Sequence, residues 1–327
     1  MAVKQLLPGL ALLCVGAVLS RAIGSATGVT ELLVAIGLGA LLVNGPGVPE
    51  RFRPGVETHG FWLAAGIVLM GASLSLSTVR EAGLVVLAVI ASVTGLTIVV
   101  VEALSRGVFG LGEKLGSLLA AGAGICGVSA VVAVAGSIRA REDQIAYAAA
   151  TVLLFDAITL VVYPIAGELL DLSDIVFGIW AGVSMFSTGP VVAVGFAYSE
   201  AAGQWATLTK LSRNALIGLI VLIYAAYYTR SGTDSRLSVR TLWEEFPTFV
   251  LGFLALAVVG SLGVFTSAHR AAIDTAYSWL FLIAFVGLGT EIQLHELRNT
   301  GLRPIVVVLL SLVIGSTLSL ALLTVLF

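Results

Sequence analysis

The most constraining feature of the sequence is an apolar stretch, residues 121–141 (AGAGICGVSAVVAVAGSIRAR), that is unsuited to one uninterrupted membrane helix. Three glycines fall within six residues of it: Gly122, Gly124 and Gly127. Each glycine in a helix interior costs about 1 kcal/mol relative to alanine. Ser129 is a favoured N-cap residue, which predicts a new short helix over Ala130–Ile138. The sequence therefore predicts a half-helix, a break at residues 125–127 and a second half-helix.

A second stretch, residues 181–199 (AGVSMFSTGPVVAVGFAYS), repeats part of this pattern sixty residues later, where 191–194 matches 131–134. Proline suits the first position of a helix, so Pro190 predicts a break and restart over residues 187–190. Irregular backbone survives in lipid only where protein or water surrounds it, and paired interrupted helices indicate a transporter binding site. The alternative is two ordinary helices whose glycines serve close packing.

Composition indicates a membrane protein. Of the 327 residues, 58% are hydrophobic and 11% are charged, with a mean hydropathy of +1.07, whereas soluble domains carry about 25% charged residues. The chain is therefore predicted to be an all-α polytopic membrane protein. Its net charge of −2 suggests no nucleic-acid partner, and Cys14 and Cys126 lie in apolar segments, which predicts no disulfide framework. No cofactor or metal site is expected.

Apolar runs of spanning length predict about eleven segments within a single integral membrane domain, residues 1–327, whose first helix is retained. Two of the segments, Leu115–Ile138 and Ile175–Tyr198, are the broken ones. The others are Leu6–Ser20, Thr30–Val43, Gly60–Leu76, Ala82–Leu104, Ile145–Ala166, Ala206–Tyr228, Phe246–Val264, Ala271–Leu294 and Pro304–Phe327. The connections on the N-terminal side hold ten Lys and Arg residues against five on the other side, which favours a cytoplasmic N-terminus in the plasma membrane.

A further internal similarity joins Gly71–Gly83 to Gly289–Gly301, at an offset of 218 residues. Many transporters are built from such repeats. We therefore expect two repeat regions, residues 60–166 and 175–327, related in inverted orientation. The order of the hairpin and the broken pair differs between the two halves, which a simple duplication does not explain.

Two basic residues, Lys210 and Arg213, lie inside a predicted span. A charge at a helix centre costs about 2.5–3.5 kcal/mol on the insertion scale. Their i, i+3 spacing places them on one face, beside Thr207 and Asn214. That face is expected to look into the helix bundle toward a cavity. The alternative is snorkelling of two long side chains to the membrane interface.

Asp156 lies near the middle of another span, with Thr159 and Tyr163 on the same face. An aspartate there must pair, be protonated or face water. One interpretation is a carboxylate that couples transport to protons or cations. The other is a structural ion pair with Lys210 or Arg213, and the sequence leaves both open.

Helix starts at Ser129 and Pro190 would add free N–H groups and about half a positive charge each. With Lys210, Arg213 and Asp156, the region would carry about +2, which suits a doubly acidic solute. We expect the two basic side chains to point at these starts. The predicted substrate-binding residues are Cys126, Gly127, Ser129, Ser187, Thr188, Gly189, Lys210, Arg213 and Asn214, and the predicted coupling residue is Asp156.

The motif GICGVSAVVAV at 124–134, with TVLLF at 151–155 and Tyr163-Pro164, resembles the ICGxSA…TVxLF…YP pattern of the YeiH-like membrane proteins, a family called sulfate exporters. Further matches are FGIWAG at 177–182, GFAY at 195–198 and ATLTKLSR at 206–213. The similarity covers most of the chain from about residue 30. It implies a fold like that of the cation:proton antiporters and bile-acid symporters, with inverted repeats and crossed broken helices.

The second break departs from this family. Family members carry His-Glu or His-Asp and then Gln where this chain has Phe186, Ser187 and Pro190. A titratable break has become an uncharged one, so the substrate or the coupling is expected to differ. Asp156, where the family has a small residue, is a candidate for the missing carboxylate.

The leading hypothesis is a secondary transporter that exports a small anion such as sulfate, sulfite or a sulfonate. The alternative is a cation- or proton-coupled transporter of an organic acid. Coupling to H⁺ or Na⁺ and assembly as a homodimer are left open by the sequence. An intramembrane enzyme is disfavoured because the chain has no HExxH and no GxSxG motif, and no ring-forming repeat suggests a channel.

Overall fold

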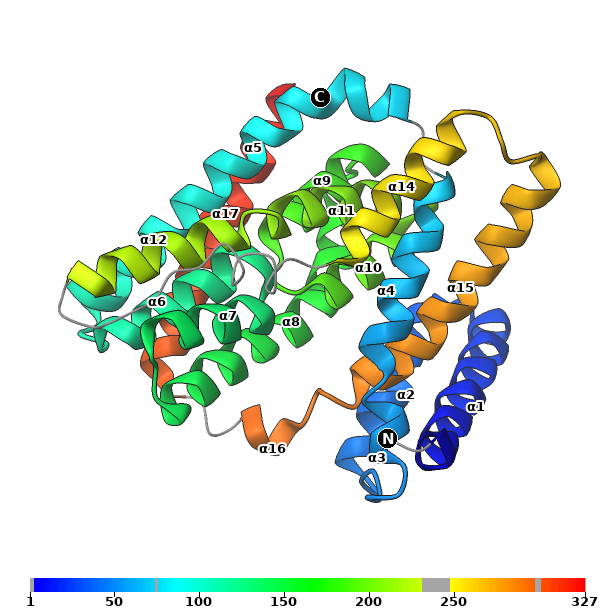
Figure 1. Ribbon diagram of the computed structural model, residues 1–327, viewed down its shortest axis with the longest axis horizontal. Helices are drawn as coiled ribbons and strands as arrows, with labels where there is room; N and C mark the ends of the chain where they lie inside the picture. Colours follow the sequence, from blue (N-terminus) through cyan, green and yellow to red (C-terminus); the bar gives the residue numbers. More distant parts are fainter. Residues whose placement is uncertain (1–2, 74–75, 231–247, 298–300, 327) are drawn as a thin grey trace. The chain divides into compact units, whose positions relative to one another are not determined.

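The computed structural model describes residues 3–73, 76–230, 248–297 and 301–326, which form helices joined by turns and short connections (Figure 1). Within these residues, six helices are long and apolar enough to cross a membrane. They are Gln5–Thr27, Gly83–Val108, Glu142–Leu169, Glu200–Tyr228, Ser267–Gly289 and Leu302–Leu326. Shorter apolar helices accompany them. The predicted all-helical multi-pass class is confirmed.

The chain divides into two compact units. The first unit comprises residues 1–83, 196–200 and 248–294. Its helices are α1 (Val3–Thr27), α2 (Glu31–Asn44), α3 (Arg53–Val56), α4 (His59–Met70), the 3₁₀ turn η1 (Gly71–Ser73), α14 (Phe249–Ser261) and α15 (Ser267–Gly289).

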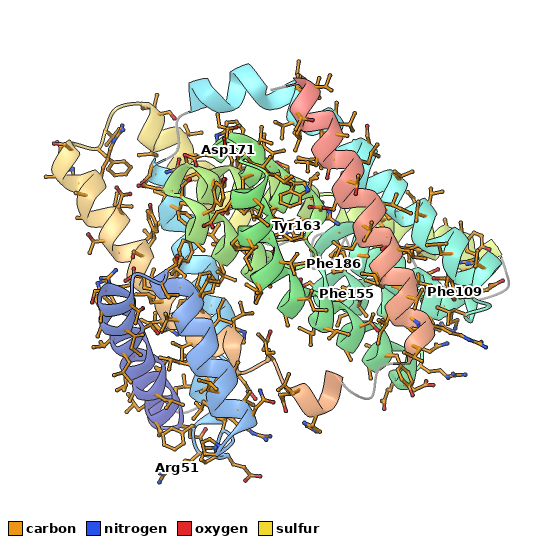
Figure 2. The ribbon with its side chains drawn as sticks, turned by 180° about the vertical axis from the view of Figure 1, so that it is seen from behind. Arg51, Phe109, Phe155, Tyr163, Asp171 and Phe186 are labelled. Carbon is orange, nitrogen blue, oxygen red and sulfur yellow. The ribbon has the colours of Figure 1, made fainter. Side chains whose placement is uncertain are left out.

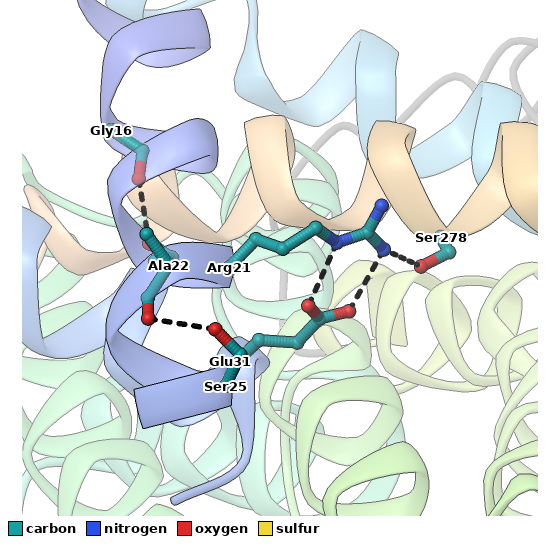
Figure 3. A network of polar contacts seen from close by, with 7 residues as sticks. Gly16, Arg21, Ala22, Ser25, Glu31 and Ser278 are labelled. Carbon is teal, nitrogen blue, oxygen red and sulfur yellow. Dashed lines mark hydrogen bonds and ion pairs between the residues drawn. The ribbon is translucent and has the colours of Figure 1, made fainter. Parts of the chain in front are cut away.

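Close helix contacts and one polar cluster hold the first unit together. A Cβ placed on Gly289 of α15 would lie 2.1 Å from the Ile36 carbonyl oxygen of α2, so only glycine permits this approach. Arg21 forms an ion pair with Glu31 at 2.9 Å and donates a hydrogen bond to Ser278 at 3.0 Å (Figure 3). These contacts tie α1 to α2 and α15.

The second unit comprises residues 84–195, 201–247 and 295–327. Its helices are most of α5 (Leu76–Ala103), the π-turn η2 (Leu104–Val108), α6 (Glu113–Ala121), the π-turn η3 (Gly122–Cys126), α7 (Val128–Ile138), α8 (Glu142–Leu169), α9 (Asp174–Ser184), most of α10 (Thr188–Tyr198), α11 (Glu200–Asn214), α12 (Ile217–Arg230), α16 (Leu294–Leu297) and α17 (Leu302–Leu326). Every candidate site residue belongs to this unit.

Several predicted boundaries are wrong. Helix α7 begins at Val128, so Ser129 is its second residue and Gly127 is the N-cap. Pro190 is the third residue of α10. The predicted span Ala206–Tyr228 lies within the candidate span Glu200–Tyr228, but it begins six residues late, and the span contains an unpredicted turn at residues 215–216 between α11 and α12. In each case the local residue preference was compatible with more than one position, and tertiary packing selected among them.

The Gly71–Gly83 and Gly289–Gly301 similarity extends over residues 74–75 and 298–300, which lie outside the described part of the chain.

Glycines bring α9 and α11 into backbone contact. A Cβ on Gly178 would lie 2.5 Å from the Ala202 carbonyl oxygen, and one on Gly182 would lie 2.7 Å from that of Ala206. Both pairs advance by four residues, which is one turn along one face of each helix. Lys210 lies four residues beyond Ala206 on the same face of α11, and its ammonium donates to the carbonyl oxygens of Met185 and Phe186, just after α9 ends. The close packing of α9 on α11 therefore carries Lys210 to the end of α9.

Candidate functional site

The two interruptions that the sequence predicted meet in the structure. In the first break, η3 ends at Cys126, and Gly127 takes φ +69° and ψ −138° before α7 starts. In the second break, α9 ends at Ser184 and α10 starts at Thr188, which leaves residues 185–187 outside both helices. A Cβ on Gly127 would lie 1.9 Å from Ser187 Oγ. Both predicted breaks are present, although the second lies at residues 185–187 rather than 187–190, and they lie against each other.

Lys210 extends from α11 into this meeting point. Its ammonium donates to the carbonyl oxygens of Ile125 at 2.7 Å and Met185 at 3.2 Å. It also donates to the carbonyl oxygen of Phe186. The side chain is 0% exposed, so it does not snorkel. One ammonium thus joins the ends of both first half-helices, α6–η3 and α9.

Arg213, one turn further along α11, completes the same contact. Its Nε donates to the Gly124 carbonyl oxygen at 2.7 Å and its Nη1 to that of Met185 at 2.7 Å. Its Nη2 donates to the carbonyl oxygen of Ala123. The residue is 1% exposed. The planar fork of a guanidinium suits several acceptors held in a fixed arrangement.

These contacts correct the predicted direction of the two cations. Lys210 and Arg213 were expected to point at the helix starts near Ser129 and Pro190. They donate to carbonyl oxygens at the ends of the preceding half-helices instead. The physical reason is that the last four carbonyls of a helix have no partner within it and carry its negative pole. A buried cation is stabilised there.

Asp156 of α8 is 3% exposed and accepts a hydrogen bond from the Ser187 backbone N–H at 3.0 Å. Ser187 immediately precedes α10, so the carboxylate lies at the positive pole of that helix, where an anion is stabilised. The Asp156 carboxylate is also near enough for its charge to act on Lys210 and Arg213. It therefore belongs to the same polar cluster as the two cations.

The remaining predicted residues line the starts of the second half-helices, α7 and α10. Asn214 donates to Thr188 Oγ1 at 3.0 Å. Ser129 is exposed, and Ser187 and Thr188 are half-buried, whereas Cys126 and Gly189 are buried. Ser129 is therefore accessible and Ser187 and Thr188 are partly so, whereas Gly127, Gly189 and the two cations are buried.

Aromatic side chains surround the breaks. Phe155 and Phe186 meet edge to face with ring centroids 6.3 Å apart, and Tyr163 stacks on Trp180 at 4.3 Å. Figure 2 labels Phe155, Tyr163 and Phe186 in the interior of this group of helices. Phe186, which stands where the resembling family has a polar residue, is 1% exposed. It packs as a core residue and offers no side-chain donor to a ligand.

A cavity of about 600 Å³ lies elsewhere in the second unit, between α5 and α12. Its walls are mostly apolar and include Glu102, Arg106 and Tyr227. None of the predicted site residues lines it. Among the described residues, no group of three or more His, Cys, Asp or Glu side chains is placed to hold a metal ion.

The arrangement matches each charge to a helix pole. Two buried cations neutralise the negative poles of the first half-helices, and one carboxylate faces a positive pole. The poles of the four half-helices cancel in pairs, so the cluster with an ionised Asp156 carries about +1, rather than the predicted +2. The hydroxyl-bearing residues Ser129, Ser187 and Thr188 at the helix starts are the part of the breaks that is exposed or half-buried.

Sequence reasoning missed two parts of this site. The acceptors of Lys210 and Arg213 are backbone carbonyls, which every residue possesses. The glycine contacts of α9 on α11 were also missed, although Gly178 and Gly182 are four residues apart in the sequence. That small-x₃-small spacing is a recognised signal for close helix packing.

The fold and the site together define an integral membrane protein of interrupted helices with a buried polar cluster at their breaks. Residues 8–308 match the family described as Conserved hypothetical protein 698, and the chain belongs to this family.

Similar proteins are described as UPF0324 membrane proteins. That of Nitratidesulfovibrio vulgaris is 32% identical, over 92% of this chain and 88% of the relative. That of Listeria monocytogenes is 33% identical, over 90% and 86%. That of Bradyrhizobium diazoefficiens is 31% identical, over 98% and 93%. No solved structure matches the chain.

Proposed function

We propose that this protein is a secondary transporter that exports a small anion, such as sulfate, sulfite or a sulfonate. The observation that carries the proposal is the meeting of two interrupted helices, where Gly127 lies against Ser187. Interrupted helices in a membrane are costly unless the freed backbone groups are used, and transporters use them to bind solutes.

An anion fits the accessible side of the breaks. The N–H groups of the first two residues of α7 and of α10 have no acceptor within their own helices, whereas Pro190, the third residue of α10, has no N–H. The positive pole of a helix favours negative charge, and since Asp156 already lies at that of α10, the start of α7 is the freer of the two. Ser129 and Thr188 add hydroxyl donors at these two starts. The buried charge of Lys210 and Arg213 adds a favourable field without a direct contact to the solute.

Several finer features belong to the same proposal. We assign the chain to the YeiH-like sulfate exporters and to the superfamily of cation:proton antiporters and bile-acid symporters. It would then have about eleven membrane segments, as the apolar runs predict, and inverted repeats. The protein would reside in the plasma membrane with a cytoplasmic N-terminus, and a homodimer is compatible with it. It would act as a transporter and not as an enzyme.

The test is flux of radiolabelled sulfate, sulfite and taurine into proteoliposomes, with imposed pH or Na⁺ gradients. The matched pair of variants is Ser129→Ala at the start of α7 and Ser137→Ala near its end, where the hydroxyl donates to the Val134 carbonyl oxygen. Loss of flux in Ser129→Ala alone supports the proposal. Failure of all three anions to move in wild-type vesicles contradicts it.

A second candidate function is proton- or cation-coupled transport of an organic acid. The observation that favours it is the buried Asp156 carboxylate at the second break. The same vesicles discriminate the two candidates. Uptake of dicarboxylates driven by a pH gradient, without competition by sulfate, would select the second candidate.

A further inference from the structure

Lys210 and Arg213 occupy a group of backbone carbonyl oxygens at the ends of the two first half-helices. Six hydrogen bonds from these two side chains reach five carbonyl oxygens within the described part of the chain. All five oxygens lie in the last residues of η3 or just after α9. In transporters with interrupted helices, such half-helix ends and unwound carbonyls coordinate Na⁺ or a proton.

The oxygens of the two breaks therefore form the kind of cage that binds a monovalent cation. A Lys ammonium is a compact point charge with three donors, and Lys210 directs these donors at three carbonyls from two different half-helices. Lys210 and the three residues that supply these acceptors, Ile125, Met185 and Phe186, are all at most 1% exposed, so the contact is shielded from solvent. The ammonium has the partners that a dehydrated inorganic cation would have.

We propose that Lys210, supported by Arg213, is a built-in substitute for a bound monovalent cation. The protein thus needs no Na⁺ at the breaks, and removal of the Lys210 side chain creates a site for a small monovalent cation. That Lys210 replaces a cation at the breaks does not depend on what the protein transports. That transport needs no Na⁺ rests on the proposed function.

The structural test uses Lys210→Ala and thermal unfolding in detergent. Methylammonium, Na⁺ or K⁺ is titrated at constant ionic strength, with N-methyl-D-glucamine as the bulky replacement. A cation that binds the folded state raises the unfolding midpoint in proportion to the logarithm of its concentration. We expect this rise for Lys210→Ala with methylammonium or Na⁺, and a flat response for the wild type.

Lys114→Ala is the matched control. Lys114 Nζ also donates to a carbonyl at a helix end, that of Arg139 at 2.8 Å, and Arg139 is the C-cap of α7. This lysine lies away from the breaks, so its removal should create no cation dependence. An equal midpoint rise in Lys114→Ala and Lys210→Ala would overturn the proposal, because it would indicate a general salt effect.

Lys210→Gln is the second test variant, for the case in which Lys210→Ala does not fold whichever cation is added. The amide of Gln donates hydrogen bonds but carries no charge. If Lys210→Gln unfolds at the wild-type midpoint without added cation, positive charge is not needed at the breaks and the proposal is wrong. A lowered midpoint in Lys210→Gln supports it.

Flux measurements in proteoliposomes separate the cation-substitute proposal from the proposed transporter function. Wild-type anion flux should be unchanged when Na⁺ and K⁺ are replaced by N-methyl-D-glucamine. If wild-type anion flux stops without Na⁺, the cation-substitute proposal is wrong, but the proposed transport function stands. Cation-dependent stability of Lys210→Ala, with no anion flux in wild-type vesicles, supports the inference and contradicts the proposed function.

Discussion

Gly127 is the position where the contact between the two breaks can be tested most directly. Its φ of +69° with ψ of −138° lies in a region that is nearly restricted to glycine, and a residue with a side chain there costs about 1–3 kcal/mol. A Cβ at this position would also lie 1.9 Å from Ser187 Oγ, 3.0 Å from its Cβ and 3.2 Å from its Cα. The hydroxyl can rotate away, but the Cβ and Cα cannot.

We expect Gly127→Ala to lose about 3 kcal/mol of stability, by adding the backbone strain to an overpacking cost of about 1–3 kcal/mol. At about 2–4 °C per kcal/mol, its unfolding midpoint should fall by about 6–12 °C. Anion flux should fall as well, because the first break can no longer lie against the second. The measurements are thermal unfolding in detergent and flux in proteoliposomes.

Gly136→Ala is the matched control in the same half-helix, since nothing lies within 4 Å of a Cβ placed there. Alanine at this interior helical position should stabilise the protein by up to about 1 kcal/mol. The double variant Gly127→Ala with Ser187→Gly should recover the part of the loss that comes from the contact. If Gly127→Ala unfolds and transports like Gly136→Ala, the breaks do not meet as described. If the double variant recovers nothing, Ser187 is not the neighbour.

Three further outcomes are expected. Asp156→Asn retains an oxygen for the Ser187 N–H, so flux should lose its pH dependence with little change in midpoint; a large drop in midpoint with an unchanged pH profile would assign Asp156 a structural role. Arg213→Lys keeps the charge but loses the planar fork whose three nitrogens donate to Ala123, Gly124 and Met185. Each buried acceptor left unsatisfied costs about 1–3 kcal/mol, so its midpoint should fall well below that of the exposed control Arg141→Lys. Burial lowers the pKa of His59, but its hydrogen bond and ion pair with Glu291 and its Val56 contact outweigh burial and raise the pKa above 6.5. Because the folded-state pKa is the higher one, the extra stability of wild type over His59→Gln should be complete below pH 6.5 and disappear as the pH rises through the folded-state value; a stability difference that grows with pH would contradict this.

Some of the fold could be predicted because it depends on local composition. Apolar runs and the scarcity of charge indicate a polytopic helical protein. The clustered glycines before residue 128 and the Ser-Thr-Gly-Pro run at 187–190 indicated both breaks to within a few residues. The turn at residues 215–216 was not predicted, since no proline or glycine marks it.

The sequence by itself determined that Lys210, Arg213 and Asp156 lie within apolar spans, where a charge needs a partner, water or, for the long basic side chains, a route to the membrane interface. Only the tertiary structure decided which partners they have. The cations contact carbonyl oxygens of the first half-helices, and Asp156 contacts the N–H before α10. Backbone groups are the same in every residue, so their choice leaves no mark in the sequence. For Lys210 and Arg213, the packing of α9 on α11 through Gly178 and Gly182 brings both side chains to the carbonyl of Met185 at the end of α9.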